Sequence, residues 1–170
     1  MTRMKFEVVI PRDLVACIRS QAVESHPKEV QGYLLGHEVI KTGKRTVATT
    51  FDVRHHLVTV EYKIRTSRKV EEKKGNELDG IWDIIGTRQI ERVGGWHSHP
   101  DGDPILSMPK DLSPKNRKDG VGSDFEAILD GQFEWICAAY PRKKTGRWVF
   151  RERAYARVGD RIYRCKINTY

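Results

Sequence analysis

Short strand-like segments separated by turn residues recur along this chain and constrain its fold more than any other feature. Four of them are rich in β-branched and aromatic residues: MKFEVVI, EVQGYLLGHEVI, RTVATTFDV and FEWICAAY. The intervening KTGK predicts a hairpin between the second and the third. Two more strands are expected near the C-terminal end, turned by Gly159 and Asp160. A chain of this kind must bury the apolar face of a sheet.

Two other segments have helical spacing. In residues 11–27, Leu14, Ile18 and Ala22 recur on one side of a helix whose first turn suits Pro11. The segment NELDGIWDIIG, residues 76–86, has apolar residues at i, i+3, i+4 and i+7. We therefore predict an α+β fold with a mixed β-sheet flanked by α-helices, in a single domain spanning residues 1–170.

The chain is strongly basic, with a formal net charge of +8 among 170 residues. Its basic residues fall in three stretches, KIRTSRKVEEKK, PKNRK and PRKKTGRWVFRERAYARVGDRIYRCK. The last reads as alternating strands with solvated outward faces, which favours solubility or an acidic protein partner over a nucleic-acid groove. We expect that nucleic acid is not the main partner.

The cysteines and the apolar runs indicate the compartment. Cys17, Cys137 and Cys165 are isolated in the sequence, so we expect reduced thiols, with Cys137 in the core. The sequence has neither an apolar run long enough to span a membrane nor a signal-peptide core after Met1. We expect a cytoplasmic protein that makes no use of a membrane.

The candidate metal ligands lie in GGWHSHPDGDPILSMPKD, residues 94–111. His97 and His99 project from the same face if the segment is extended, and Pro100 places them at the end of a strand. A catalytic zinc site needs three protein ligands and keeps one open position. The nearby candidates for the third ligand are Asp101, Asp103 and Asp111.

Three separated motifs resemble those of the zinc-dependent JAMM/MPN peptidases, also called JAB or Mov34 domains. They are HSHP, the Ser107 and Asp111 that follow it, and EVQGYLLG well upstream. The order of strands and helices resembles that family over most of the chain, which implies a curved mixed sheet. The resemblance further implies that Zn²⁺ is bound by His97, His99 and Asp111, that Glu29 is the general base, and that Ser107 steadies the oxyanion.

This sequence departs from the family motif in the spacing between Ser107 and Asp111. The family has two residues between them, whereas SMPKD has three. A helix beginning at Ser107 would put Lys110 in the ligand's place, but a helix beginning at Pro109 keeps Asp111 at the right depth. We prefer a helix that begins at Pro109. Ser107, and not Asp111, is then the residue shifted from its position in the family motif.

The resemblance also implies a substrate class. Such enzymes cleave isopeptide or peptide bonds at the C-terminus of ubiquitin or ubiquitin-like proteins, and compact prokaryotic members act in sulfur-carrier processing or anti-phage conjugation systems. Segments 63–80 and 112–130 correspond in position to the two family insertions that contact the modifier. Two alternatives stay open: a non-catalytic MPN scaffold and a basic nucleic-acid-binding JAB-like module. The sequence leaves the oligomeric state open.

Overall fold

The computed structural model describes residues 2–58, 62–65, 70–72, 90–100, 102–108 and 123–170. Its elements, in chain order, are β1 (Arg3–Ile10), α1 (Arg12–Ser25), β2 (Gln31–Thr42), β3 (Thr46–Val58), β4 (Tyr62–Arg65), β5 (Val70–Glu72), β6 (Glu91–His99), α4 (Asp124–Ala127), β7 (Phe133–Pro141), β8 (Trp148–Val158), β9 (Arg161–Arg164) and β10 (Lys166–Thr169).

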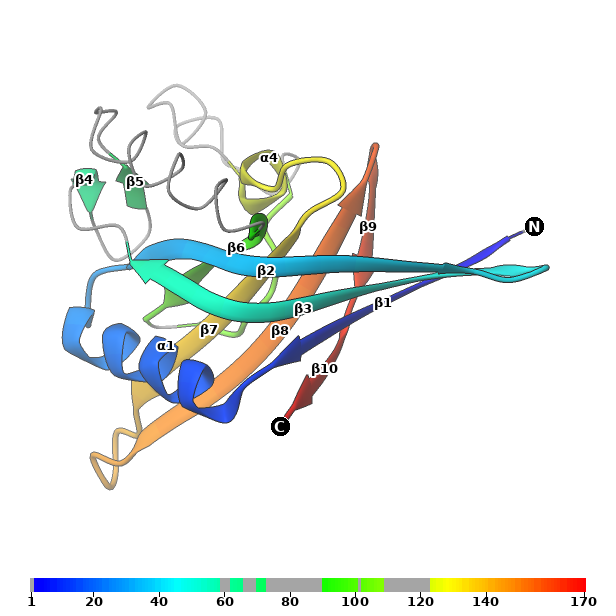
Figure 1. Cartoon of the computed structure of the whole chain (residues 1–170). Helices are drawn as coiled ribbons and strands as arrows, with labels where there is room; N and C mark the ends of the chain where they lie inside the picture. Colours follow the sequence, from blue (N-terminus) through cyan, green and yellow to red (C-terminus); the bar gives the residue numbers. More distant parts are fainter. Residues whose placement is uncertain (1, 59–61, 66–69, 73–89, 101, 109–122) are drawn as a thin grey trace.

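Eight strands form one mixed sheet in the order β10-β1-β3-β2-β6-β7-β8-β9 (Figure 1). The pairs β1–β10, β1–β3 and β6–β7 are parallel, and the other neighbours are antiparallel. The predicted hairpin between β2 and β3 is confirmed, as are the strand ending at His99 and the turn at Gly159, whose φ is +56°. Strands β4 and β5 pair with each other in a separate two-stranded sheet.

The C-terminal strands bend the sheet until it nearly closes. Strand β9 pairs with β8, and only Cys165 separates it from β10, which pairs with β1 at the other edge. The Cys165 N–H donates to the carbonyl of Ala154 on β8, so the crossing point is itself hydrogen-bonded. In Figure 1 this red band runs from the top of β8 down to β1. The sequence patterns did not reveal that the last strand changes its partner.

Helix α1 covers one side of the sheet and contacts β7. It buries Val15, Ile18 and Ala22, so the predicted apolar face is confirmed, with Val15 buried more fully than Leu14. Among the described residues α4 is the other helix, and it has only four residues. The mixed sheet is therefore confirmed, whereas flanking by helices is seen on a smaller scale than expected. The predicted helix over 76–86 lies outside the described residues.

The core lies between α1 and the concave face of the sheet. Trp96, Phe51, Phe133 and Trp135 are its largest fully buried side chains. Cys137 is buried in it as expected, and all three cysteines are free thiols. Within the described part of the chain, no helix has the length and apolar character needed to span a membrane.

Candidate metal centre

The two predicted histidines lie at the end of β6, which β2 and β7 flank. Cross-strand neighbours share a face of the sheet: Gln31 and Ile136 lie opposite His97, and Ala138 lies opposite His99. Both imidazoles therefore project from the face opposite the Trp96 side chain, which is fully buried in the core. Their Nε2 atoms are 3.0 Å apart. The prediction that the HxH pair converges on one point is confirmed.

Hydrogen bonds fix which ring nitrogen of each histidine faces the site. His97 Nδ1 lies 2.7 Å from Oε1 of Glu134, and His99 Nδ1 lies 3.1 Å from the carbonyl oxygen of Asp103. A carboxylate and a carbonyl are acceptors, so both Nδ1 atoms carry the hydrogen. In the neutral rings, both Nε2 atoms then have a lone pair available for a metal ion.

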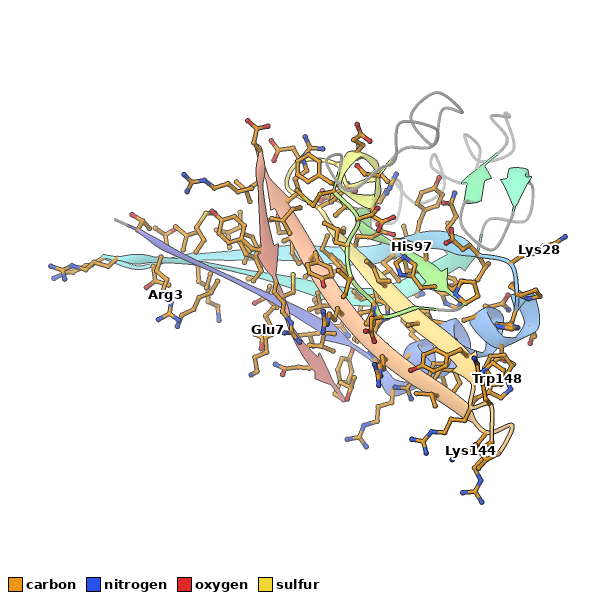
Figure 2. All side chains as sticks on the ribbon, turned by 180° about the vertical axis from the view of Figure 1, so that it is seen from behind. Arg3, Glu7, Lys28, His97, Lys144 and Trp148 are labelled. Atoms are coloured by element: carbon orange, nitrogen blue, oxygen red, sulfur yellow. The ribbon has the colours of Figure 1, made fainter. Side chains whose placement is uncertain are left out.

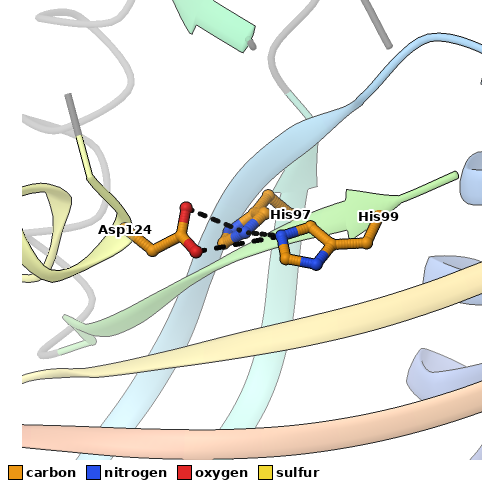
Figure 3. A group of neighbouring side chains, drawn as sticks. All are labelled: His97, His99 and Asp124. Carbon is orange, nitrogen blue, oxygen red and sulfur yellow. Dashed lines mark hydrogen bonds and ion pairs between the residues drawn. The ribbon is translucent and has the colours of Figure 1, made fainter. Parts of the chain in front are cut away.

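The third member of the cluster is Asp124, on the first turn of α4 (Figure 3). Its Oδ1 lies 3.5 Å from His97 Nε2, and its Oδ2 lies 3.8 Å from His99 Nε2. A capping box formed by Ser123 and Glu126 starts this short helix and holds the aspartate at its mouth.

Ser107 connects the loop after β6 to this helix. Its backbone N–H donates to Oδ2 of Asp124 at 2.7 Å, and its Oγ accepts the Asp124 N–H at 2.9 Å. The two residues are thus paired through both backbone and side chain. The serine predicted for the site lies beside it, although residues 108–123 separate the serine from the aspartate in the sequence.

The predicted ligand Asp111 and the alternative Asp101 lie outside the described residues. Asp103, the other alternative, contributes its carbonyl to His99 while its carboxylate pairs with Arg151. It therefore orients a ligand and does not join the cluster. Among the described residues, Asp124 is the carboxylate that lies close to the Nε2 atoms of both histidines.

Glu134 supports His97 from the neighbouring strand β7. Glu134 lies opposite Gly95 in the parallel register, and Gly95 precedes His97 by two residues, so Glu134 and His97 share a face of the sheet. Both are 7% exposed. A Cβ at position 95 would lie 2.4 Å from Oε2 of Glu134. The glycine therefore provides the space that this carboxylate occupies.

These charges determine the protonation of His97 when no metal is bound. Burial of the imidazole by itself lowers the pKa of His97. The hydrogen bond to Glu134 and the negative charges of Asp124, Glu134 and Glu29 together outweigh the effect of burial, and the pKa of His97 rises to about 9. The site thus attracts positive charge strongly, which suits a cation.

Glu29 comes just before β2. The Val30 carbonyl accepts the Ser98 N–H at 2.8 Å, and the Val30 N–H donates to Ser98 Oγ at 3.0 Å. Continuing the register from Gln31 and His97 places Glu29 opposite His99, on the face that carries both histidines. Its charge also contributes to the raised pKa of His97. The predicted general base is therefore near the predicted metal ligands.

The donor set fits a zinc ion. Zinc prefers imidazole nitrogen and carboxylate oxygen at about 2.0–2.2 Å, so its tetrahedral ligands are roughly 3.3 Å apart. The three contacts among His97, His99 and Asp124 span 3.0 to 3.8 Å. Three protein ligands leave one position open, as catalytic zinc sites do. His97, His99 and Asp124 are thus positioned to bind a metal ion.

Two residues of this centre were not predicted from the sequence. Glu134 is a lone carboxylate in the otherwise apolar strand FEWICAAY, and a charge in a buried strand is a usable signal. Asp124 follows Ser123 in SDFE, a capping-box pattern that marks a helix start. Both signals are local, and neither indicates proximity to the histidines.

Comparisons with known proteins identify the family of this chain. Residues 11–112 match the family described as prokaryotic homologs of the JAB domain; the matched range includes Glu29, both histidines, Ser107 and Asp111, but not Asp124. No curated protein matches.

Solved structures share the fold, and two of them serve as examples. The solution structure of protein DSY2949 from Desulfitobacterium hafniense is 12% identical, with a TM-score of 0.57 over 96% of this chain and 92% of that one. A protein from Salinibacter ruber is 19% identical, with a TM-score of 0.50 over 95% of this chain and 90% of that one. At such identities the likeness concerns the fold alone. Because the family match covers more than half of the chain, this protein belongs to the family of prokaryotic homologs of the JAB domain.

Proposed function

We propose that this protein is a zinc-dependent peptidase that cleaves peptide or isopeptide bonds after the C-terminus of ubiquitin or a ubiquitin-like protein. The observation that carries the proposal is the convergence of His97, His99 and Asp124 on one point with Glu29 beside them. A scaffold has no need for three converging ligands and a nearby carboxylate base.

The proposal gives each of these residues a role. His97, His99 and Asp124 would hold the ion, which would act as a Lewis acid and lower the pKa of a coordinated water to about 7. Glu29 accepts a proton from the attacking water and returns it to the leaving amine. The Ser107 hydroxyl, which accepts the Asp124 N–H through its oxygen, donates its hydrogen to the developing oxyanion.

The substrate class rests on family membership and on charge. The resemblance to JAMM/MPN peptidases implies that the site acts at the C-terminus of a small protein modifier, and the net charge of +8 favours an acidic modifier surface or conjugate. The same membership supports a role in prokaryotic conjugation, including antiviral defence.

The decisive experiment replaces Glu29 by glutamine, which keeps the side-chain shape and removes the proton acceptor. The substrates are ubiquitin and prokaryotic ubiquitin-like proteins, each fused through its C-terminal tail to a fluorescent reporter. We expect Glu29→Gln to retain zinc and to lower the hydrolysis rate by about 10²- to 10⁴-fold, with little change in KM.

The matched control is Glu24→Gln, which removes an exposed carboxylate on α1 and should leave the rate unchanged. A Glu29→Gln protein that retains zinc and cleaves a substrate as fast as the wild type would exclude Glu29 as the base. Absence of cleavage by the wild type across the whole panel, with zinc bound, would favour the non-catalytic alternative.

A further inference from the structure

A cavity of about 400 Å³ lies where the curved sheet fails to close completely. It is lined by residues from the first half of β1, from β3, and from the end of β9 into β10. In Figure 1 the start of β1 and strand β9 diverge at this point. Figure 2 shows Arg3, which lines the cavity, far from His97, so the cavity is separate from the metal centre.

Two bare strand edges flank the cavity. Strand β10 pairs with β1 only along Glu7–Ile10, so Arg3–Phe6 have no strand on that side within the described residues. Strand β9 is the last strand of the sheet and, in the same described part, pairs on one side only. Each edge presents backbone N–H and C=O groups that a further strand would satisfy.

The floor of the cavity is apolar. Phe6 is 7% exposed, and its ring centroid lies 5.1 Å from that of Tyr163. Met4 packs beside them against the core. A floor of this kind accepts an apolar side chain, and the volume is within the roughly 300–1,000 Å³ of typical ligand sites.

The rim is strongly basic. Four exposed cations surround the floor: Arg3, Lys5, Arg164 and Lys166. Glu7 is the one carboxylate that lines the cavity, and it pairs with Lys166 Nζ at 3.5 Å and accepts a hydrogen bond from Asn168. The other three cations form no ion pair with any described residue. The rim therefore has an excess of positive charge.

We propose that this cavity binds an extended acidic segment of a partner protein, which adds as a strand to the bare edge of β1. The acidic side chains of the segment pair with the rim, and one of its apolar side chains fills the floor. The bare edges favour this partner over a nucleic acid, because an extended peptide backbone presents alternating N–H and C=O groups at the spacing of the strand edge. The docked partner would lie away from the metal centre and leave that centre free for its substrate.

The test measures the binding of a fluorescein-labelled decapeptide of alternating aspartate and valine by fluorescence anisotropy. We expect saturable binding that weakens as salt is raised. The double variant Lys5→Glu/Arg164→Glu should raise Kd by about tenfold or more. The matched control, Lys143→Glu/Lys144→Glu, makes the same charge change in the exposed turn between β7 and β8, far from Arg3 in Figure 2, and should leave Kd within about twofold.

Modified probes test the backbone pairing on the unmodified protein. N-methylation of all valines in one peptide and of all aspartates in another blocks alternate N–H groups, and at least one of these peptides should lose binding by about tenfold. The proposal is overturned if both methylated peptides bind as well as the parent. It is equally overturned if a peptide with lysine in place of aspartate binds as tightly, or if a ten-nucleotide oligothymidylate binds while the acidic peptide does not. Circular dichroism and zinc content confirm that each variant is folded.

Discussion

The carboxylate of Glu134 lies 2.7 Å from Nδ1 of His97, and both side chains are buried. A carboxylate in this position orients the imidazole, fixes the hydrogen on Nδ1, and makes Nε2 a stronger ligand. Such partners of metal-bound histidines contribute strongly to affinity although they do not contact the ion.

Replacing Glu134 by glutamine should therefore weaken metal binding. The amide keeps the size of the side chain but removes the charge, so we expect zinc affinity to fall by about 10- to 100-fold. Competition with a chromophoric chelator measures this. Glu24→Gln, an exposed carboxylate on α1, is the control, and equal affinities of the two variants would contradict the positioning role.

A methyl group at Gly95 should disturb the same contact from the other side. The added Cβ would lie 2.4 Å from Oε2 of Glu134, so Gly95→Ala must displace that side chain. We expect a loss of stability of about 1–3 kcal/mol, typical of overpacking, together with weaker zinc binding. Urea unfolding measures the first effect and chelator competition the second. Because both changes act on one contact, Gly95→Ala should weaken zinc binding much less in a Glu134→Ala background.

The identity of the carboxylate ligand is tested by two conservative substitutions. We expect Asp124→Asn to lose most of the bound zinc, because it removes a charged ligand next to both histidines. Asp111→Asn should retain it. Elemental analysis of the purified, folded proteins distinguishes the two, and the opposite pattern would return the ligand role to Asp111, as the serine–aspartate motif of the sequence predicts.

Metal binding should release a proton near neutral pH. His97 has a pKa of about 9 in the metal-free protein and must be neutral to coordinate. Below pH 9 this proton competes with the metal. Loss of the proton should therefore raise the apparent zinc affinity by about tenfold for each pH unit up to pH 9. Titration calorimetry at pH 7.5 in buffers of different ionisation enthalpy should detect about one released proton.

The raised pKa of His97 should also make the stability of the metal-free protein fall as the pH rises, which is opposite to the trend in zinc affinity. Because the pKa is raised by folding, the extra stability is fully present below the ordinary histidine value of 6.5 and is lost as the pH rises through about 9. Urea unfolding of metal-free protein between pH 6 and pH 9.5 should show this decline. A flat profile would mean that Glu134 does not hold the proton on His97.

Local sequence patterns predicted the features that depend on neighbouring residues alone, namely individual strands, the end of a strand and the buried face of a helix. Runs of β-branched and aromatic residues identified β2 and β3, Pro100 located the end of β6, and helical spacing found the buried face of α1. The convergence of His97 and His99 was predictable, because residues two positions apart on one strand share a face of the sheet whatever the rest of the chain does.

Contacts between distant segments were not predictable in this way. Asp124 lies at the histidines because Ser107 holds it through two hydrogen bonds, and no rule of sequence spacing predicts a contact between residues 107 and 124. Glu134 depends on the parallel register that places it opposite Gly95. The partner change at Cys165 depends on the curvature of the whole sheet.

The pairing of β1 with β10 also determines when the fold can be completed. Glu7 lies opposite Lys166 and Ile10 opposite Thr169, so the second edge of β1 is covered along Glu7–Ile10 only after residues 166–169 have been made. Contacts of such sequence separation are slow to form, because loop closure must precede them. During synthesis the inner half of β1 is exposed until residue 166 leaves the ribosome, which makes the nascent chain dependent on protection from aggregation at that edge.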